Sequence, residues 1–196
     1  MTTLSAELIR KTALDNGADL CGIASIERFK DCPKETHPLS LFPETKSIIV
    51  CANRILKGCY KGIQEGTDWS TYWVHGYGTG IYSSLGKAMG AIANLLEDNG
   101  HEAVASPGGH TLLDEAPPPR PPLAKGKLPP GVMLHMRVSA ALAGLGEIGW
   151  SKVFLTPEFG PRQRFEIILT DAELEPSPIF KDHICDKCNI CVKTCP

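Results

Sequence analysis

The spacing of apolar residues predicts two helices that each bury one face. Over 83–98 the apolar positions recur at helical intervals and form a single stripe. Ser83 or Ser84 is suited to cap the start of this helix, and the Asn-Gly pair at 99–100 to end it. A similar pattern predicts a helix over 4–16. The stripe of the longer helix consists of Leu85, Ala88, Met89, Ile92, Leu95 and Leu96.

Short apolar runs bounded by turn residues predict strands, and small residues over 138–145 predict one further short helix. Helices and strands alternate without a regular βαβ rhythm, so we predict an α+β fold rather than a doubly wound parallel sheet. The runs cover 18–24, 47–52, 103–106, 153–156 and 165–170.

A proline-rich segment interrupts this pattern. Seven prolines between positions 115 and 130 exclude a helix or a paired strand and favour an extended loop. A surface insertion is the simplest interpretation, and a lid over a site is the alternative.

Composition narrows the function classes. The net charge of −2 gives no signal for nucleic acid or an anionic membrane surface. No apolar stretch is long enough to span a bilayer. The N-terminal residues resemble neither a secretory nor a twin-arginine leader, so we expect a cytoplasmic protein.

Four cysteines at the end of the chain have the spacing of an iron–sulfur ligand run. Cys185, Cys188 and Cys191 follow at three-residue steps, and Cys195 directly precedes Pro196. In bacterial ferredoxins such a run supplies three thiolates to one cluster, while the cysteine before proline binds another. We therefore expect two 4Fe–4S clusters in a longer protein of which this chain is an N-terminal fragment.

Zinc and disulfides are the alternatives for this run. Structural zinc sites usually separate two Cys-x-x-Cys pairs by a long spacer, whereas these cysteines are crowded together. Disulfides are disfavoured in a chain without a secretory leader. Positions 171–180, with two prolines, read as a linker, and we divide the chain into 1–174 and 175–196.

The glycines Gly144, Gly146 and Gly149 match the dinucleotide fingerprint on paper. That fingerprint requires a strand before it and a helix after it, and here the order is reversed, so we reject a Rossmann site. The glycines either let the backbone approach a flat ligand or form tight turns. Arg162 and Arg164 either hold an anionic group or pair with acidic neighbours.

Four segments stand in a fixed order: 143–149 (Ala-Gly-Leu-Gly-Glu-Ile-Gly), 155–162 (Leu-Thr-Pro-Glu-Phe-Gly-Pro-Arg), 169–171 (Leu-Thr-Asp) and the cysteine run. In composition, order and spacing they resemble the superfamily of epoxyqueuosine reductases and reductive dehalogenases. Looser similarity reaches back to 17–24, so the resemblance covers most of the chain.

The resemblance implies a nitroreductase-like α+β domain that binds base-off cobalamin, followed by the start of a ferredoxin-like 4Fe–4S domain. It makes Gly144, Gly146 and Gly149 candidates for contact with the corrin, and Arg162 and Arg164 candidates for binding cofactor or substrate. The corrinoid motif Asp-x-His-x-x-Gly is absent, which fits base-off binding.

The chain departs from the family pattern at the position of the catalytic acid. The family segment Val-Asp-(Ser/Thr)-Ala-Pro has its nearest match in Leu-Asp-Glu-Ala-Pro at 113–117, which makes Asp114 a candidate proton donor. A capping or solvated aspartate is the alternative. The tyrosines Tyr72, Tyr77 and Tyr82 are further candidates.

Two function classes remain open from the sequence. The first is an epoxyqueuosine reductase-like enzyme that reduces an epoxide, halide or similar centre of a small-molecule or tRNA-borne substrate, with electrons from a reduced ferredoxin or flavodoxin. The second is an electron-transfer protein without substrate chemistry, and a flavin-binding reductase is a further possibility. The large domain before the cysteine run favours an enzyme, because a simple ferredoxin needs no such domain.

Overall fold

The computed structural model describes residues 4–106, 121–129 and 132–195. A four-stranded sheet in the order β1-β2-β6-β3 forms the centre of the fold. Every neighbouring pair of strands is antiparallel, which confirms the α+β class and excludes a doubly wound parallel sheet. The strands are β1 (Leu20–Ser25), β2 (Ser47–Arg54), β3 (Ala103–Ser106) and β6 (Gln163–Thr170).

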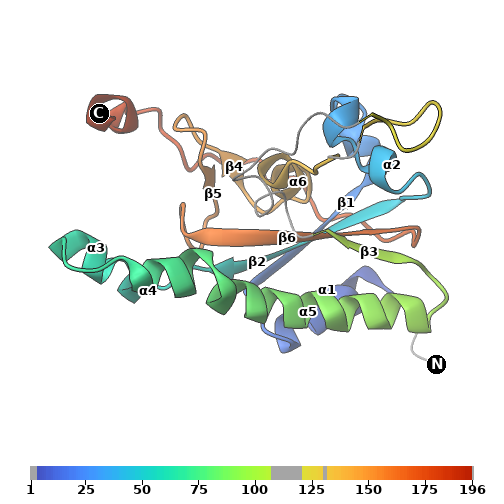
Figure 1. The fold of residues 1–196 in the computed structure, drawn as a ribbon, viewed down its shortest axis with the longest axis horizontal. Coiled ribbons are helices and arrows are strands. Elements are labelled where there is room, and N and C mark those ends of the chain that lie inside the picture. Colours follow the sequence, from blue (N-terminus) through green and yellow to red (C-terminus); the bar gives the residue numbers. More distant parts are fainter. Residues whose placement is uncertain (1–3, 107–120, 130–131, 196) are drawn as a thin grey trace.

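Helices cover both faces of this sheet. Helices α1 (Ala6–Asp15) and α5 (Thr79–Asp98) lie on one face, and α6 (Met136–Leu142) lies on the other (Figure 1). Strand β2 is therefore buried over seven consecutive residues, as is typical of a strand covered on both sides.

Two apolar clusters fill the layers on either side of the sheet. On the α1 and α5 side, Ile9, Leu85, Ile92 and Leu96 pack against Ile168 of β6. On the α6 side, the neighbouring β6 residues Phe165, Ile167 and Leu169 pack with residues of β2 and α6. Side chains of β6 thus alternate between the two clusters, as the period of a strand requires.

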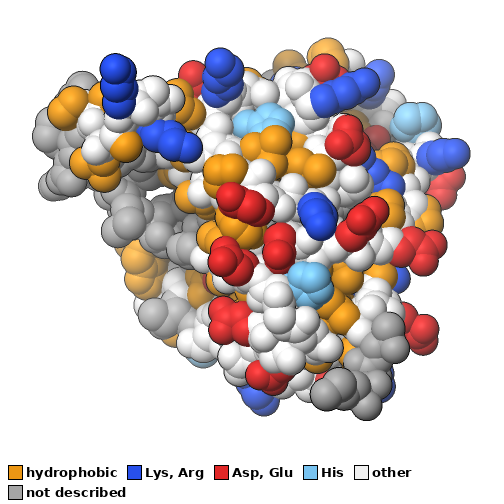
Figure 2. Space-filling model, turned by 90° about the vertical axis from the view of Figure 1, so that its right-hand side faces the viewer, with side chains coloured by type: hydrophobic (Ala, Val, Ile, Leu, Met, Phe, Trp, Pro, Cys, Tyr) orange, Lys and Arg blue, Asp and Glu red, His pale blue; other side chains and the backbone are white. Residues whose placement is uncertain are grey.

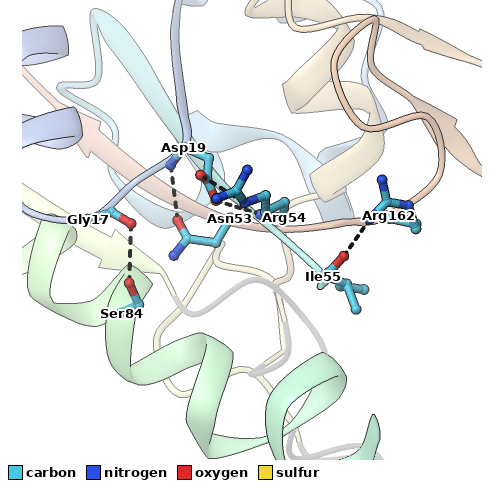
Figure 3. A network of polar contacts seen from close by, with 7 residues as sticks. All are labelled: Gly17, Asp19, Asn53, Arg54, Ile55, Ser84 and Arg162. Atoms are coloured by element: carbon cyan, nitrogen blue, oxygen red, sulfur yellow. Dashed lines mark hydrogen bonds and ion pairs between the residues drawn. The ribbon is translucent and has the colours of Figure 1, made fainter. Parts of the chain in front are cut away.

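The start of α5 differs from the prediction. The helix begins at Thr79 rather than Ser83, after a Gly78 that makes no side-chain cap. The Ser84 hydroxyl instead donates to the Gly17 carbonyl at 3.2 Å and joins α5 to the turn after α1 (Figure 3). The end is as predicted, because Asn99 follows the last turn and Gly100 has a φ of 81°.

Shorter elements extend beyond the three layers. A π-helical turn at Trp73–Tyr77 leads directly into α5, and single π turns are frequent at functional sites. The described proline-rich residues 121–129 contain neither helix nor strand, as predicted. The remaining helices and strands are η1 (Ile26–Phe29), η2 (Lys34–Thr36), α2 (Pro38–Leu41), η3 (Lys57–Tyr60), α3 (Lys61–Glu65), α4 (Ser70–Tyr72), η4 (Trp73–Tyr77), β4 (Glu147–Ile148), β5 (Phe154–Leu155) and α7 (Ile190–Thr194).

The surface in Figure 2 mixes acidic, basic and apolar side chains, without a continuous basic patch on that face. No helix within the described ranges is long and apolar enough to cross a membrane.

We predict that Ile168→Ala lowers the free energy of unfolding by about 2–5 kcal/mol, because it opens a cavity beneath α5. Ile168 is fully buried in the central strand β6. Urea denaturation measures the change, and Leu14→Ala at a half-exposed position of α1 is the control. A loss no larger than that of the control would contradict this account of the core.

Candidate functional site

The cysteine run lies in a largely exposed segment at the end of the described chain. Cys185 is half-buried, whereas Cys188, Cys191 and Cys195 are exposed. Two left-handed residues flank Cys188, with φ values of 56° at Lys187 and 62° at Asn189. They turn the chain sharply on both sides of the second cysteine.

The thiols of this run do not converge. Within the described residues, no group of three or more Cys, His, Asp or Glu side chains is placed to hold a metal ion. The donor set nevertheless fits an iron–sulfur cluster in its chemistry, because four thiols at ferredoxin spacing lie on one accessible segment, with a tight turn around Cys188 and the short helix α7 around Cys191. The assignment of Cys185, Cys188, Cys191 and Cys195 as ligands stays a prediction.

Glu147 of β4 connects the start of this run to the domain. Its Oε1 atom accepts hydrogen bonds from the amides of Ile184 and Cys185, both at 2.6 Å. The other carboxylate oxygen of Glu147, Oε2, lies 3.6 Å from Nδ1 of His183. The Cys185 amide is the main cause that lowers the pKa of Glu147, because it stabilises the charged form.

A backbone amide also reaches the first thiol. The N–H of Trp150 donates to Cys185 Sγ at 3.3 Å. Trp150 belongs to the turn of the β4–β5 hairpin, which contains a third left-handed residue, Lys152. Among the described non-glycine residues, only Lys152, Lys187 and Asn189 have positive φ, so this strained geometry is confined to the hairpin turn and the cysteine loop.

The glycine segment packs tightly against the protein itself. Gly144 has a φ of 78°, and a side chain there would overlap the carbonyl oxygen of Pro178. A side chain at Gly146 would overlap the carbonyl oxygen of Leu155. These contacts account for both glycines through close backbone packing. Contact of Gly144, Gly146 and Gly149 with a corrin stays a prediction.

The linker before the cysteine run is fixed to the edge strand β1. Ser177 and Ile23 exchange two hydrogen bonds: the Ser177 amide donates to the Ile23 carbonyl at 2.8 Å, and the Ile23 amide donates to Ser177 Oγ at 3.0 Å. The Arg28 guanidinium donates to the carbonyls of Ser177 and of Leu142, the last residue of α6. The path of the chain toward Cys185 is therefore set by the sheet and by α6.

Arg162 extends the pairing of β2 with β6. Its guanidinium donates to the Ile55 carbonyl at 2.8 Å (Figure 3), and the Ile55 amide donates to the Arg162 carbonyl at 2.9 Å. Arg162 is thus tied to the end of β2.

Arg164 lies on the α5 side of β6 and is surrounded by aromatic residues. Its guanidinium donates to the Gly76 carbonyl at 3.0 Å and to the Tyr72 hydroxyl at 2.9 Å, and lies over the Tyr77 ring at 4.6 Å. Tyr72 in turn packs against the ring of Tyr60. The described ion pairs join neither Arg162 nor Arg164 to an acidic side chain.

Burial alters the proton affinity of groups near Arg164. It raises the pKa of Tyr82 to about 12, and it raises the pKa of Glu166, two residues along β6 from Arg164, to about 7. From the sequence, Glu166 is expected only as one of the acidic neighbours with which Arg162 and Arg164 could pair, and not as a group with a raised pKa. Its signal would have been a charged residue inside a strand expected to be buried.

The structure does not bring all predicted site residues together. Gly144 and Gly146 pack around Pro178 and Leu155, whereas Arg164 contacts the π-helical turn on the α5 side. The candidate proton donor Asp114 lies outside the described residues. The region where β6 begins lies between β4 and β5 on one side and α4 on the other (Figure 1).

Comparison with known sequences gives a partial match. No protein-family model matches the chain. Tetrachloroethene reductive dehalogenases of Desulfitobacterium hafniense and Dehalobacter restrictus are 40% identical to it over 69 and 60 residues. These matches cover 34% and 29% of this chain but only 12% and 11% of the dehalogenases.

Comparison with solved structures covers nearly the whole chain. An epoxyqueuosine reductase with an epoxyqueuosine-modified tRNA stem loop matches 95% of it with a TM-score of 0.63 and 16% identity. A catabolic reductive dehalogenase in complex with 3-bromo-4-hydroxybenzoic acid matches 97% with a TM-score of 0.63 and 18% identity. The chain spans 50% of the first protein and 25% of the second.

The chain thus has the fold of a domain found in epoxyqueuosine reductases and reductive dehalogenases, which confirms the resemblance seen in its motifs.

We predict that Glu166→Gln stabilises the chain at alkaline pH and has little effect at acidic pH. The folded-state pKa of about 7 lies above an unfolded value of about 4.3, so the folded chain binds more protons between them. The contribution of Glu166 to stability is therefore full below about pH 4 and is lost as the pH rises through about 7.

Because the side chain is partly solvated, we expect Glu166→Gln to raise the free energy of unfolding by about 1–2 kcal/mol at pH ~8.5 and by almost nothing at pH ~4.5. Urea denaturation at several pH values measures this free energy, with exposed Glu173→Gln as the control. A difference in stability between Glu166→Gln and the wild-type chain that does not vary with pH would contradict the raised pKa of Glu166.

Proposed function

We propose that this chain is the cofactor-binding part of an iron–sulfur oxidoreductase related to epoxyqueuosine reductases and reductive dehalogenases. Residues 1–174 would form a nitroreductase-like domain for base-off cobalamin, and residues 175–196 would begin a ferredoxin-like domain. Such an enzyme would accept electrons from a reduced ferredoxin or flavodoxin and reduce an epoxide, a halide or a similar centre. Its substrate would be a small molecule or a tRNA-borne group.

One observation carries this proposal: a cysteine run with ferredoxin spacing is held by hydrogen bonds on an α+β domain of the epoxyqueuosine reductase fold. A carrier protein needs no such domain. One matching solved structure is described as suggesting a mechanism for B12-dependent dehalogenation. Both features favour an enzyme with an internal electron supply over a simple carrier.

The four cysteines of the run would bind the iron–sulfur clusters. The thiolates of Cys185, Cys188 and Cys191 would bind one 4Fe–4S cluster, and Cys195 a second. Clusters supply single electrons, and a base-off cobalamin supplies a strongly reducing metal centre.

Polar groups around the start of β6 would serve the substrate. Arg164, oriented by Tyr72 and Tyr77, would hold an anionic group, since a guanidinium suits forked hydrogen bonds. Burial raises the pKa of Glu166 to about 7, so this side chain would hold a proton close to Arg164 below neutral pH. Asp114 stays a further candidate for the proton donor.

Metal analysis of the anaerobically purified polypeptide, with whatever follows Pro196 in its gene, tests the proposal. Iron together with about one cobalt per chain would support it. A flavin spectrum without cobalt would favour a flavin reductase, and iron alone would favour an electron carrier. A colourless, zinc-loaded protein would overturn it.

We predict that Cys188→Ser removes the visible absorption of one cluster, because an alkoxide or hydroxyl poorly replaces a thiolate ligand. Iron content and the visible spectrum measure the loss. Cys32→Ser, outside the run, is the control and should leave both unchanged. Full iron content in Cys188→Ser would contradict the ligand assignment.

The 196-residue chain alone is predicted to hold fewer than two intact clusters, since a single run supplies too few thiolates for both. Iron analysis after anaerobic reconstitution measures this, and a value of about eight irons per chain would contradict it.

A further inference from the structure

The first cysteine of the run is held at two atoms by one short segment of the α+β domain. The Glu147 carboxylate accepts hydrogen bonds from the amides of Ile184 and Cys185, and the Trp150 amide donates a hydrogen bond to Cys185 Sγ. The carboxylate thus fixes the backbone of the cysteine while the amide contacts its sulfur. Of the four cysteines in the run, Cys185 is the half-buried one.

The contact is built from partly buried groups. The Glu147 side chain keeps only 23% of its surface exposed, and both hydrogen bonds to its Oε1 are short and charge-assisted. Charge-assisted bonds of this kind are stronger than those between neutral groups.

The β4–β5 hairpin does not depend on Glu147's carboxylate for its own geometry. Glu147 pairs with Leu155 and Ile148 with Phe154 through the backbone. The Gly149 amide donates to the Val153 carbonyl at 2.9 Å and closes the turn. The carboxylate therefore has no role in the hairpin ladder, and within the described part of the chain its hydrogen-bond and ion-pair partners all belong to 183–185.

We propose that Glu147 is a positioning residue for the redox centre: it holds the first thiolate ligand in place beneath the Trp150 amide. The inference rests on the proposed function, because it assumes that Cys185 binds a cluster. Hydrogen bonds to ligating sulfur and the charges around a cluster are the means by which a protein sets its reduction potential. The α+β domain would in this way tune the cluster that supplies it with electrons.

Two variants separate charge from hydrogen bonding. Glu147→Gln keeps an acceptor oxygen but removes the negative charge, so a cluster at Cys185 should become easier to reduce. Glu147→Ala removes the acceptor, so the amides of Ile184 and Cys185 should exchange with solvent faster. Glu158→Gln changes the same charge on an exposed residue of the loop after β5 and is the matched control.

Amide hydrogen exchange of the metal-free chain is the first measurement. We expect exchange at Ile184 and Cys185 to accelerate by about tenfold or more in Glu147→Ala and to stay at the wild-type rate in Glu158→Gln. The second measurement is a redox titration of the reconstituted protein followed by electron paramagnetic resonance. In that titration, the midpoint potential of Glu147→Gln should be more positive than that of the wild-type protein, and the midpoint potential of Glu158→Gln should be unchanged.

The outcomes distinguish this inference from the proposed function. Wild-type exchange in Glu147→Ala and an unchanged potential in Glu147→Gln, in a protein that holds iron, would overturn the role of Glu147 and leave the proposed function standing. A wild-type protein without iron would overturn the proposed function and, with it, any tuning by Glu147. A purely structural role would change stability without shifting the potential of Glu147→Gln, and that result would also overturn the inference.

Discussion

The antiparallel pairing of β2 with β6 is the interaction on which the other features depend. It runs without interruption from Ser47 opposite Thr170 to Arg54 opposite Gln163. Because both strands are covered on both faces, a slip of one residue would exchange the two faces of β6. Such a slip would take Ile168 out of the cluster beneath α5. The burial of two separate apolar clusters therefore also decides which way the polar residues at the start of β6 face.

Arg164 shows how this constraint reaches beyond the sheet. The π-helical turn η4 lies beside a small apolar cluster formed by Ile55, Cys59 and Ile81, because a side chain at Gly76 would touch Ile55. Tyrosines pack around this cluster. So small a cluster contributes little burial to hold the turn in place. The Arg164 guanidinium bonds to Gly76 within that turn and stacks on Tyr77, so it links the turn directly to the central sheet. The environment of the tyrosines is in this sense a consequence of the register of β6.

Local periodicity made much of this fold predictable, and contacts between distant segments explain what was missed. The apolar stripe of α5 follows from spacing alone. The start of this helix at Thr79 does not, because the Ser84 hydroxyl bonds to the Gly17 carbonyl and does not cap the helix. The cysteine run could be predicted because its ligand spacing is a local pattern of the sequence. The role of Glu147 could not be predicted, because its carboxylate gains a partner only when the fold brings Cys185, far along the sequence, close to it. No local pattern distinguishes such a glutamate from a solvated one.

One continuous stretch of chain carries two groups of candidate site residues. It begins with the glycine segment at 144–149, passes through β5 and reaches the start of β6, where Arg164 and Glu166 lie. Every described residue from 186 to 195 is exposed, so the end of the cysteine run receives little stabilisation from burial. Cys185 differs because it is bonded to Glu147 and Trp150 within this stretch. A site that must be held in a defined geometry is best built on rigid elements with supporting hydrogen bonds. The position of the first cysteine relative to Arg164 is accordingly set by the α+β domain rather than by the exposed loop.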